Sequence, residues 1–145
     1  MATHLMDSPG MAEEAFYRAF ELGDLDAMMA VWAGSPDICC IHPMGPLLTG
    51  PVAIHESWQE IFRAQLPRRF EIDCISRFEH GDLAVHVLHE TIVLPLHRQR
   101  LPTLATTNIY RREASVWRMV MHHASVIGTE APEAPSKGKP PTTRH

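Results

Sequence analysis

The hydrophobic pattern of this chain changes its period near the middle, and this change constrains the fold more than any single motif. In the first half, apolar residues recur at the three- and four-residue spacing of amphipathic helices. From residue 70 onward, apolar and polar residues alternate, as they do in half-buried β-strands. Helices followed by consecutive strands are typical of an α+β domain, in which the helices cover one face of an antiparallel sheet.

Three helices are predicted before the change of period. The first ends at Gly23, and its apolar face consists of Ala12, Ala15, Phe16, Ala19 and Phe20. Asp24 can cap a short second helix that continues through Trp32. The third helix begins at Pro51, where a proline fits the first turn, and it ends before Pro67.

Five strands are predicted. A short one covers residues 37–42, between the second and third helices. Four longer strands follow the third helix as an antiparallel meander, at residues 70–78, 83–95, 103–112 and 116–127. The helices are the only cover available for one face of this sheet. A sheet that curls around them would leave a cavity between the two layers.

The chain of 145 residues is predicted to form one domain over residues 10–128, between a flexible arm (1–9) and a disordered, proline-rich tail (129–145). Its formal charge of -4 gives no electrostatic reason to expect nucleic acid as a partner. No run approaches the roughly 20 apolar residues of a membrane span. No secretory signal is visible, and Cys39, Cys40 and Cys74 are expected to be free thiols in a reducing cytoplasm.

Two segments carry a family resemblance. Residues 16–62 combine a helix, Gly-Asp-Leu-Asp, a tryptophan, a strand ending in His-Pro, a glycine and a helix with a central tryptophan. Residues 107–125 end in a strand of the type Trp-Arg-x-Val-x-His-His-Ala-Ser. Together they resemble the SnoaL-like branch of the nuclear transport factor 2-like superfamily. The resemblance implies a cystatin-like α+β barrel, a cone in which a bent mixed or antiparallel sheet wraps around three helices and a pocket opens at the wide end.

The resemblance also implies a homodimer formed through the outer face of the sheet. It does not settle the reaction. The superfamily includes ketosteroid isomerase, polyketide cyclases, epoxide hydrolases, dehydratases and many pocketed proteins with no known reaction, so the fold alone carries little function.

His42 is the leading candidate for a site residue, because it ends a buried strand and a proline follows it. In ketosteroid isomerase, which this segment resembles, an aspartate at this place moves a proton beside a carbonyl. A histidine could serve as such a base, since its ordinary pKa near 6.5 suits neutral pH. The isomerase's oxyanion tyrosine falls at Phe16, which has no hydroxyl, and Tyr17 would point about 100° away around the helix. The resemblance therefore argues against isomerase activity, and His42 is either a pocket-lining polar residue or a structural histidine.

The last strand carries two adjacent histidines, which must lie on opposite faces of the sheet. The face with Trp117 looks like the core, and this predicts that His123 and Ser125 point inside. On this assignment His123 is a second candidate for catalysis, and His122 lies at a dimer interface. A β-bulge would invert the assignment.

Further residues are expected to line a ligand pocket: Phe16, Trp32, Cys40, Trp58, Phe62, Asn108, Tyr110 and Ser125. Structural explanations stay open beside this one, with the aromatic residues and Cys40 as core and Asn108 bonded to backbone. No metal or other cofactor is predicted, because no element carries a His-x-His or His-x-x-x-His pair. Only the fold could bring His42, His123 and Cys40 together as ligands.

The sequence therefore favours a protein that binds a small, largely apolar molecule, with His42 and His123 as the polar groups of its pocket. If it is an enzyme, cofactor-free acid/base chemistry of the isomerase, cyclase or hydratase type is expected. Two alternatives stay open. One is a non-catalytic binding or dimerisation module that uses the outer face of the sheet, and the other is a metal-dependent enzyme that uses the histidines.

Overall fold

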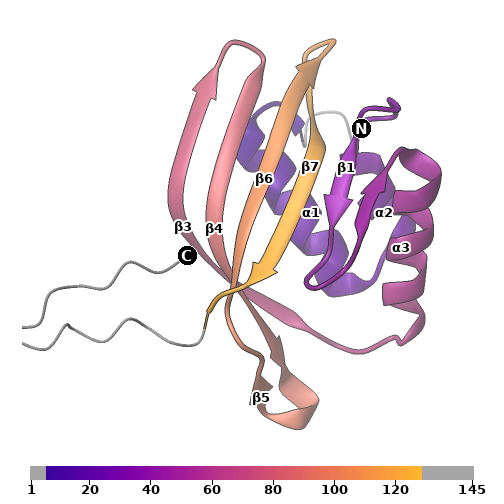
Figure 1. Cartoon of the computed structure of the whole chain (residues 1–145), viewed down its shortest axis with the longest axis vertical. Coiled ribbons are helices and arrows are strands. Elements are labelled where there is room, and N and C mark those ends of the chain that lie inside the picture. Colours follow the sequence, from indigo (N-terminus) through magenta and orange to yellow (C-terminus); the bar gives the residue numbers. More distant parts are fainter. Residues whose placement is uncertain (1–5, 129–145) are drawn as a thin grey trace, which may run out of the picture.

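The computed structural model describes residues 6–128, in which three helices pack against one face of a curved seven-stranded sheet (Figure 1). The helices are α1 (Pro9–Leu22), α2 (Leu25–Val31) and α3 (Pro51–Arg63). The strands are β1 (Cys39–Ile41), β2 (Leu47–Thr49), β3 (Arg69–His80), β4 (Leu83–Leu94), β5 (Gln99–Arg100), β6 (Leu104–Glu113) and β7 (Val116–Val126). A 3-10 turn, η2 (Pro95–His97), precedes β5. The predicted α+β cone is confirmed.

The first two helices begin and end at the residues that the sequence indicates. The Ser8 hydroxyl caps α1 by accepting a hydrogen bond from the backbone N–H of Met11 at 3.1 Å. Gly23 ends α1 with a φ of 64°, a left-handed conformation that glycine adopts without strain. The Asp24 carboxylate then accepts from the N–H of Ala27 at 3.0 Å and starts α2.

The expected N-terminal arm is shorter than predicted. Residue Pro9 is already helical, and Met6 is buried with 9 % of its surface exposed. The rest of the predicted arm, residues 1–5, and the predicted tail, 129–145, lie outside the described residues.

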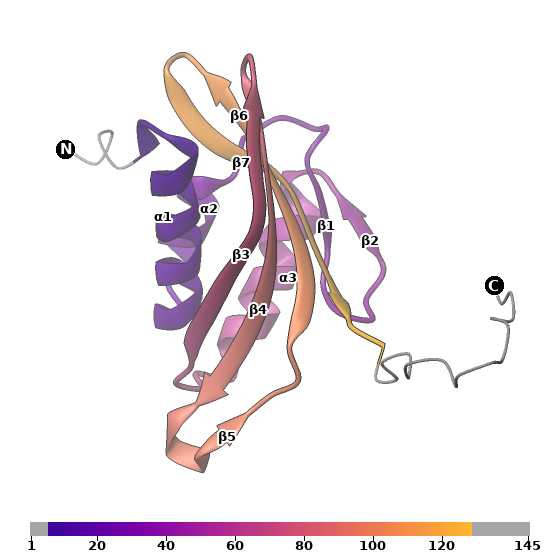
Figure 2. The same ribbon diagram turned by 90° about the vertical axis from the view of Figure 1, so that its left-hand side faces the viewer.

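The sheet order is β2-β1-β7-β6-β4-β3. The four long strands form the predicted antiparallel meander, and β1 adds to its edge in parallel with β7. Strand β2 is not predicted from the sequence, because three residues are too few to show an alternating pattern. Figure 2 shows the long strands curving past the helices, with the short β5 segment projecting beyond the sheet.

The helical layer and the inner face of the sheet meet in an aromatic core. Phe16 and Trp58 are both fully buried, and their ring centroids lie 5.6 Å apart. Phe20 joins them, with its ring 4.7 Å from Trp58 and 4.4 Å from Phe70 at the start of β3. These contacts fix α1 and α3 against the concave side of the sheet.

The register between β6 and β7 shifts once. Ile109 pairs with Met121, whereas the next residue, Tyr110, pairs with Met119. Val120 is thus an extra residue on β7, as in a β-bulge, and the alternation of faces along β7 is offset beyond it.

This bulge overturns the predicted orientation of the two histidines. Trp117 faces the core as predicted, but beyond the bulge His122 is the buried residue, with 1 % of its surface exposed. His123 and Ser125 are exposed on the other face. The prediction that these two residues point inside is therefore wrong.

The core assignment predicts unequal effects of removing two phenylalanine rings. Phe16→Ala is expected to lower the free energy of unfolding by about 3–5 kcal/mol, because it leaves a cavity among fully buried rings. Phe78→Ala on β3, where the ring is 55 % exposed in the single chain, is expected to cost the fold of that chain less than about 1 kcal/mol. Urea unfolding of both variants measures the difference, and equal losses would contradict the assignment.

Candidate functional site

A row of mostly polar residues crosses the inner face of the sheet. In register, Arg77 of β3 lies opposite His86 of β4, which lies opposite Asn108 of β6. Asn108 pairs with His122 of β7, and His122 pairs with Cys40 of β1. Alternation along each strand therefore brings residues that are far apart in the sequence onto one line beneath α1 and α3.

Four buried groups of this region form a continuous chain of hydrogen bonds, here called the relay: Glu90, Tyr17, Asn108 and His122. The Tyr17 hydroxyl donates to Glu90 Oε2 at 2.5 Å and accepts from Asn108 Nδ2 at 3.0 Å. His122 Nδ1 lies 2.6 Å from Asn108 Oδ1. Because an amide oxygen can only accept, His122 Nδ1 carries the proton, and Nε2 is the unprotonated nitrogen of the neutral ring.

Burial sets the charge of both ends of the relay. It raises the pKa of Glu90 to about 7, although hydrogen bonding from Tyr17 opposes the rise. The nearby hydroxyl of Thr106 also lowers the pKa of Glu90, although the geometry between the two groups falls short of a hydrogen bond. Burial, assisted by the neighbouring His42 and then His123, lowers the pKa of His122 to about 3. At neutral pH His122 is therefore uncharged, and Glu90 is close to its midpoint.

His42 lies just beyond β1, half-buried, as the sequence predicts for a residue at the end of that strand. Its Nε2 lies 3.0 Å from the Ser57 hydroxyl, and that hydroxyl donates to the Ile54 carbonyl at 2.8 Å. Ser57 has one proton to give, so it accepts from His42 Nε2, and Nδ1 is left as the basic nitrogen. Burial lowers the pKa of His42, which favours the neutral ring.

The ring of His42 lies beside two other rings of the site. Its centroid is 4.8 Å from Trp58, edge to face, and 6.2 Å from His122. Trp58 is also 6.0 Å from His122. The indole nitrogen of Trp58 is buried and has no hydrogen-bond partner among residues 6–128. An unpaired buried donor of this kind costs about 1–3 kcal/mol.

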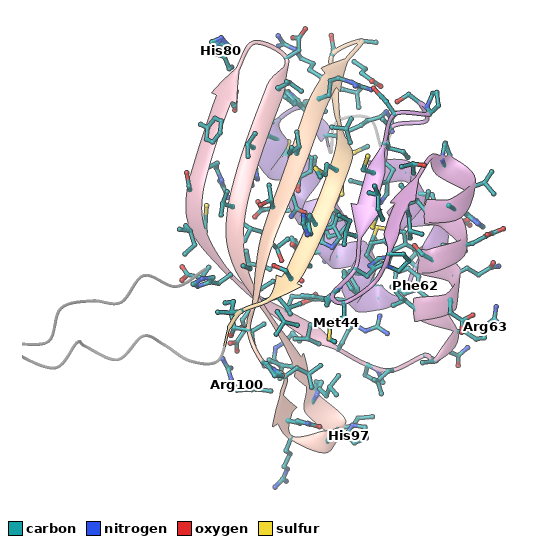
Figure 3. The ribbon with its side chains drawn as sticks, viewed as in Figure 1. Met44, Phe62, Arg63, His80, His97 and Arg100 are labelled. Carbon is teal, nitrogen blue, oxygen red and sulfur yellow. The ribbon has the colours of Figure 1, made fainter. Side chains whose placement is uncertain are left out.

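The side of His42 that faces the interior is closed by packed side chains. Cys40, whose sulfur lies 3.5 Å from His42 Nε2, is fully buried, as are Trp58 and Phe16. Burial raises the pKa of the Cys40 thiol to about 12, so it is a core residue and not a nucleophile. In the β1–β2 turn that follows His42, Met44 is 91 % exposed (Figure 3).

A second polar cluster lies at the other end of the row. Glu13 of α1 accepts from His86 Nδ1 at 2.6 Å and lies 3.5 Å from Arg77. The ring of Tyr110 lies 5.0 Å from His86, and its buried hydroxyl has no partner among the described residues.

Only some of the candidate residues predicted from the sequence lie near His42 and His122. Phe16, Trp58 and Asn108 lie close to His42 or to His122, and Phe62 packs against Trp58. The structure does not bring Trp32 or Tyr110 to His42, because both pair with Met119 before the bulge. His123 and Ser125 lie outside.

Sequence reasoning missed Tyr17, Ser57, Glu90 and His122 as site residues. The sequence does contain a signal for Glu90. Because side chains alternate along a strand, Glu90 and His86 lie on the same face of β4, and a carboxylate that faces the core requires a partner.

A surface hollow of about 390 Å³ lies between α1 and β3, and its lining includes Glu13, Tyr17 and Ile72. It brings solvent to the edge of the relay. Within residues 6–128, no three His, Cys, Asp or Glu side chains are grouped so that they could hold a metal ion. Over the same residues, no helix combines the length and apolar character that crossing a membrane requires.

A cone of this topology, with polar residues on its concave face, defines a nuclear transport factor 2-like protein with a cystatin-like fold. The chain belongs to the SnoaL-like domain family, whose model matches residues 12–129.

Two solved structures and one curated protein show how far the similarity extends. A Thiobacillus denitrificans protein described as a calcium/calmodulin-dependent protein kinase type II association domain is 37 % identical, with a TM-score of 0.81 over 86 % of this chain and 98 % of that one. A Streptomyces avermitilis protein described as a dehydratase of the NTF2-like family is 27 % identical, with a TM-score of 0.74 over 83 % and 94 % of the two chains. F-box protein SKIP8 of Arabidopsis thaliana is 30 % identical over 103 residues, which is 71 % of this chain but 42 % of SKIP8. The chain thus spans less than half of that relative.

Glu90 is predicted to make stability fall as pH rises. Its folded-state pKa of about 7 lies above the ordinary value near 4.5, so the folded state holds the proton more tightly than the unfolded state. The stability is fully present below pH 4.5 and decreases by roughly 3 kcal/mol between pH 4.5 and 7. Glu90→Gln is expected to remove this decrease, whereas Glu79→Gln, at an exposed position of β3, is expected to keep it. Urea unfolding at several pH values tests this, and an equal pH dependence for wild type and Glu90→Gln would contradict it.

Proposed function

We propose that the protein binds a small, largely apolar molecule through a hydrogen-bonding group at His42, Trp58 and His122. The observation that carries this proposal is the buried, unpaired N–H of Trp58, whose ring lies beside two histidines. Native proteins rarely leave such a donor unpaired. A ligand that accepts its hydrogen bond would remove the cost.

The three groups together favour a hydroxyl on the ligand. Trp58 offers a donor, and His42 and His122 each have one ring nitrogen that can accept. A hydroxyl can accept from the indole and donate to an imidazole at the same time, whereas a hydrocarbon can do neither. The surrounding rings would hold the apolar body of the ligand. Because Trp58 is buried behind His42, the half-exposed His42 ring must swing outward to admit the ligand.

Proton transfer at His42 is the chemistry that such a site would support. The burial that lowers the pKa of His42 keeps the ring neutral, so its Nδ1 is available as a base at neutral pH. Tyr17 does face the interior, but its hydroxyl is engaged by Glu90 and Asn108 and does not serve as a free oxyanion donor. Hydration or dehydration therefore fits better than enolate chemistry, and the similarity to the Streptomyces avermitilis protein supports this class.

The site is expected to distinguish 2-naphthol from naphthalene. Binding of 2-naphthol should be at least about fivefold tighter, since one net hydrogen bond contributes about 1 kcal/mol or more. His42→Ala and Trp58→Phe should each remove most of this preference, and Trp58→Phe should retain the aromatic wall and hence the naphthalene affinity. NMR titration of the Trp58 indole N–H and the His42 ring measures both ligands. Equal affinity for the two compounds in wild type would contradict a polar site.

A second candidate function, self-association, is supported by the outer face of the sheet. The helices cover only the inner face, and the outer face presents partly exposed apolar side chains: Ile41, Phe78, Val85, Val87, Ile109 and Met121. Contiguous apolar surface of this kind is typical of protein interfaces. The 37 % identical protein described as an association domain supports the same function. We propose a homodimer formed through this face.

Val87→Arg, in the middle of this face, is expected to convert a dimer into a monomer, because it buries an unpaired charge in the interface. Leu22→Arg, at an exposed position on the helical side, is the matched control and should remain dimeric. Sedimentation velocity measures the mass of each protein. A monomeric wild type, or a dimeric Val87→Arg variant, would contradict the proposed interface.

A further inference from the structure

We propose that Glu90 acts through Tyr17 and Asn108 to set the tautomer of His122, and so decides whether the site accepts or donates a hydrogen bond there. Glu90 would then be a positioning residue that determines ligand specificity without touching the ligand. The consequence for specificity rests on the proposed function, but the relay itself can be tested without any ligand.

In the observed arrangement, every proton of the relay points toward Glu90. His122 donates from Nδ1 to Asn108 Oδ1, Asn108 Nδ2 donates to Tyr17, and Tyr17 donates to Glu90. This direction requires an acceptor at the end of the chain, which an ionised carboxylate provides. His122 then presents an unprotonated Nε2 on the side of the ring away from Asn108.

A proton on Glu90 can reverse this direction while the three heavy-atom contacts stay in place. The carboxyl then donates to the Tyr17 oxygen, and Tyr17 turns its own proton toward Asn108. The Asn108 amide rotates by half a turn, so that its oxygen accepts from Tyr17 and its nitrogen donates to His122 Nδ1. The imidazole loses a proton from Nδ1 to water and gains one from water at Nε2. The net change is one proton taken up, at Glu90.

The surroundings of Glu90 permit this proton to arrive near neutral pH. Burial raises its pKa to about 7, and the hollow between α1 and β3 reaches its partner Tyr17. The other titratable or charged side chains of the buried polar region are Glu13 and Tyr17 on α1, Arg77 on β3, His86 on β4, Tyr110 on β6 and His122 on β7. The hollow that reaches Tyr17 is also lined by the charged residues Glu14, Arg18 and Glu21. Thr106, a close neighbour on β6 with an unpaired hydroxyl, is a competing acceptor for the carboxyl proton.

With fast reversal, the tautomer of His122 would follow the protonation of Glu90 over about pH 5.5 to 8.5. The pKa of His122 is too low for the ring itself to become charged in this range. The ¹⁵N shifts of His122 in the ligand-free protein report the tautomer directly. We expect Nδ1–H above this range and Nε2–H below it, with a midpoint near 7.

Three conservative variants distinguish the relay from general effects of pH. Tyr17→Phe removes the oxygen that joins Glu90 to Asn108, and it should abolish the pH-dependent change at His122. Tyr110→Phe removes a buried hydroxyl that lies near Asn108 but makes no hydrogen bond among the described residues, so it should keep the change. Glu90→Gln should also abolish the change, because an amide does not titrate in this range. Circular dichroism confirms that each variant is folded.

A single His122 tautomer across the whole range in wild type would overturn the inference and would show that the carboxyl proton goes elsewhere, with Thr106 as the nearest alternative acceptor. A change that persists in Tyr17→Phe would overturn it as well. Either result leaves the naphthol titration unaffected, so failure of the relay and failure of the proposed ligand site are distinguishable.

Discussion

The contact between α1 and the polar row of the sheet is the constraint on which the rest of this structure depends. Glu13 and Tyr17 are four residues apart and therefore project from the same face of α1. Their partners, His86 and Asn108, lie directly opposite each other on β4 and β6. Apolar packing alone would tolerate small shifts of a helix on a sheet, but a buried carboxylate or amide without its partner costs several kcal/mol. The two polar contacts thus fix the register of α1, and α1 in turn carries Phe16 into the ring cluster against Trp58 and His122.

The same region contains buried polar groups with hydrogen-bond partners and one buried indole nitrogen without a partner among the described residues. Every member of the relay has a partner at 2.5–3.0 Å, as a network that only stabilises the core would require. The indole nitrogen of Trp58 has none among the described residues, although it lies within the aromatic cluster that the relay borders. A phenylalanine at this position would remove the unpaired donor, but it would also leave a cavity among the packed rings around a fully buried residue. On the proposed function a ligand supplies the partner of this nitrogen, and binding to the Trp58→Phe variant tests that explanation.

The fold was predictable from local patterns because each pattern rests on short-range physics. The helical spacing around Phe16, the left-handed stop at Gly23 and the alternation from residue 70 onward depend on a few neighbouring residues. The candidate site was predictable only in part. The place of His42 could be predicted because it ends a strand. The inward orientation of His122, in contrast, depends on one extra residue in β7, Val120. A bulge of this kind leaves no recognisable pattern in an alternating apolar run. Tyr17 and Glu90 meet over 73 positions of sequence, so their bond follows from the packing of α1 on β4 and not from any motif.

The two histidines of the candidate site, His42 and His122, differ in which groups hold their protons, and this difference bears on any reaction at the site. The tautomer of His42 is fixed by Ser57, whose own proton is committed to the Ile54 carbonyl, and neither of these two partners titrates. The tautomer of His122 is held by a chain that ends at a carboxyl with a pKa of about 7. A neutral His42 base beside a partner that accepts a hydrogen bond only when Glu90 is ionised would work best above neutrality, where both rings accept. If the site transfers protons, its rate should therefore rise with the deprotonation of Glu90, a residue that is remote from the ligand.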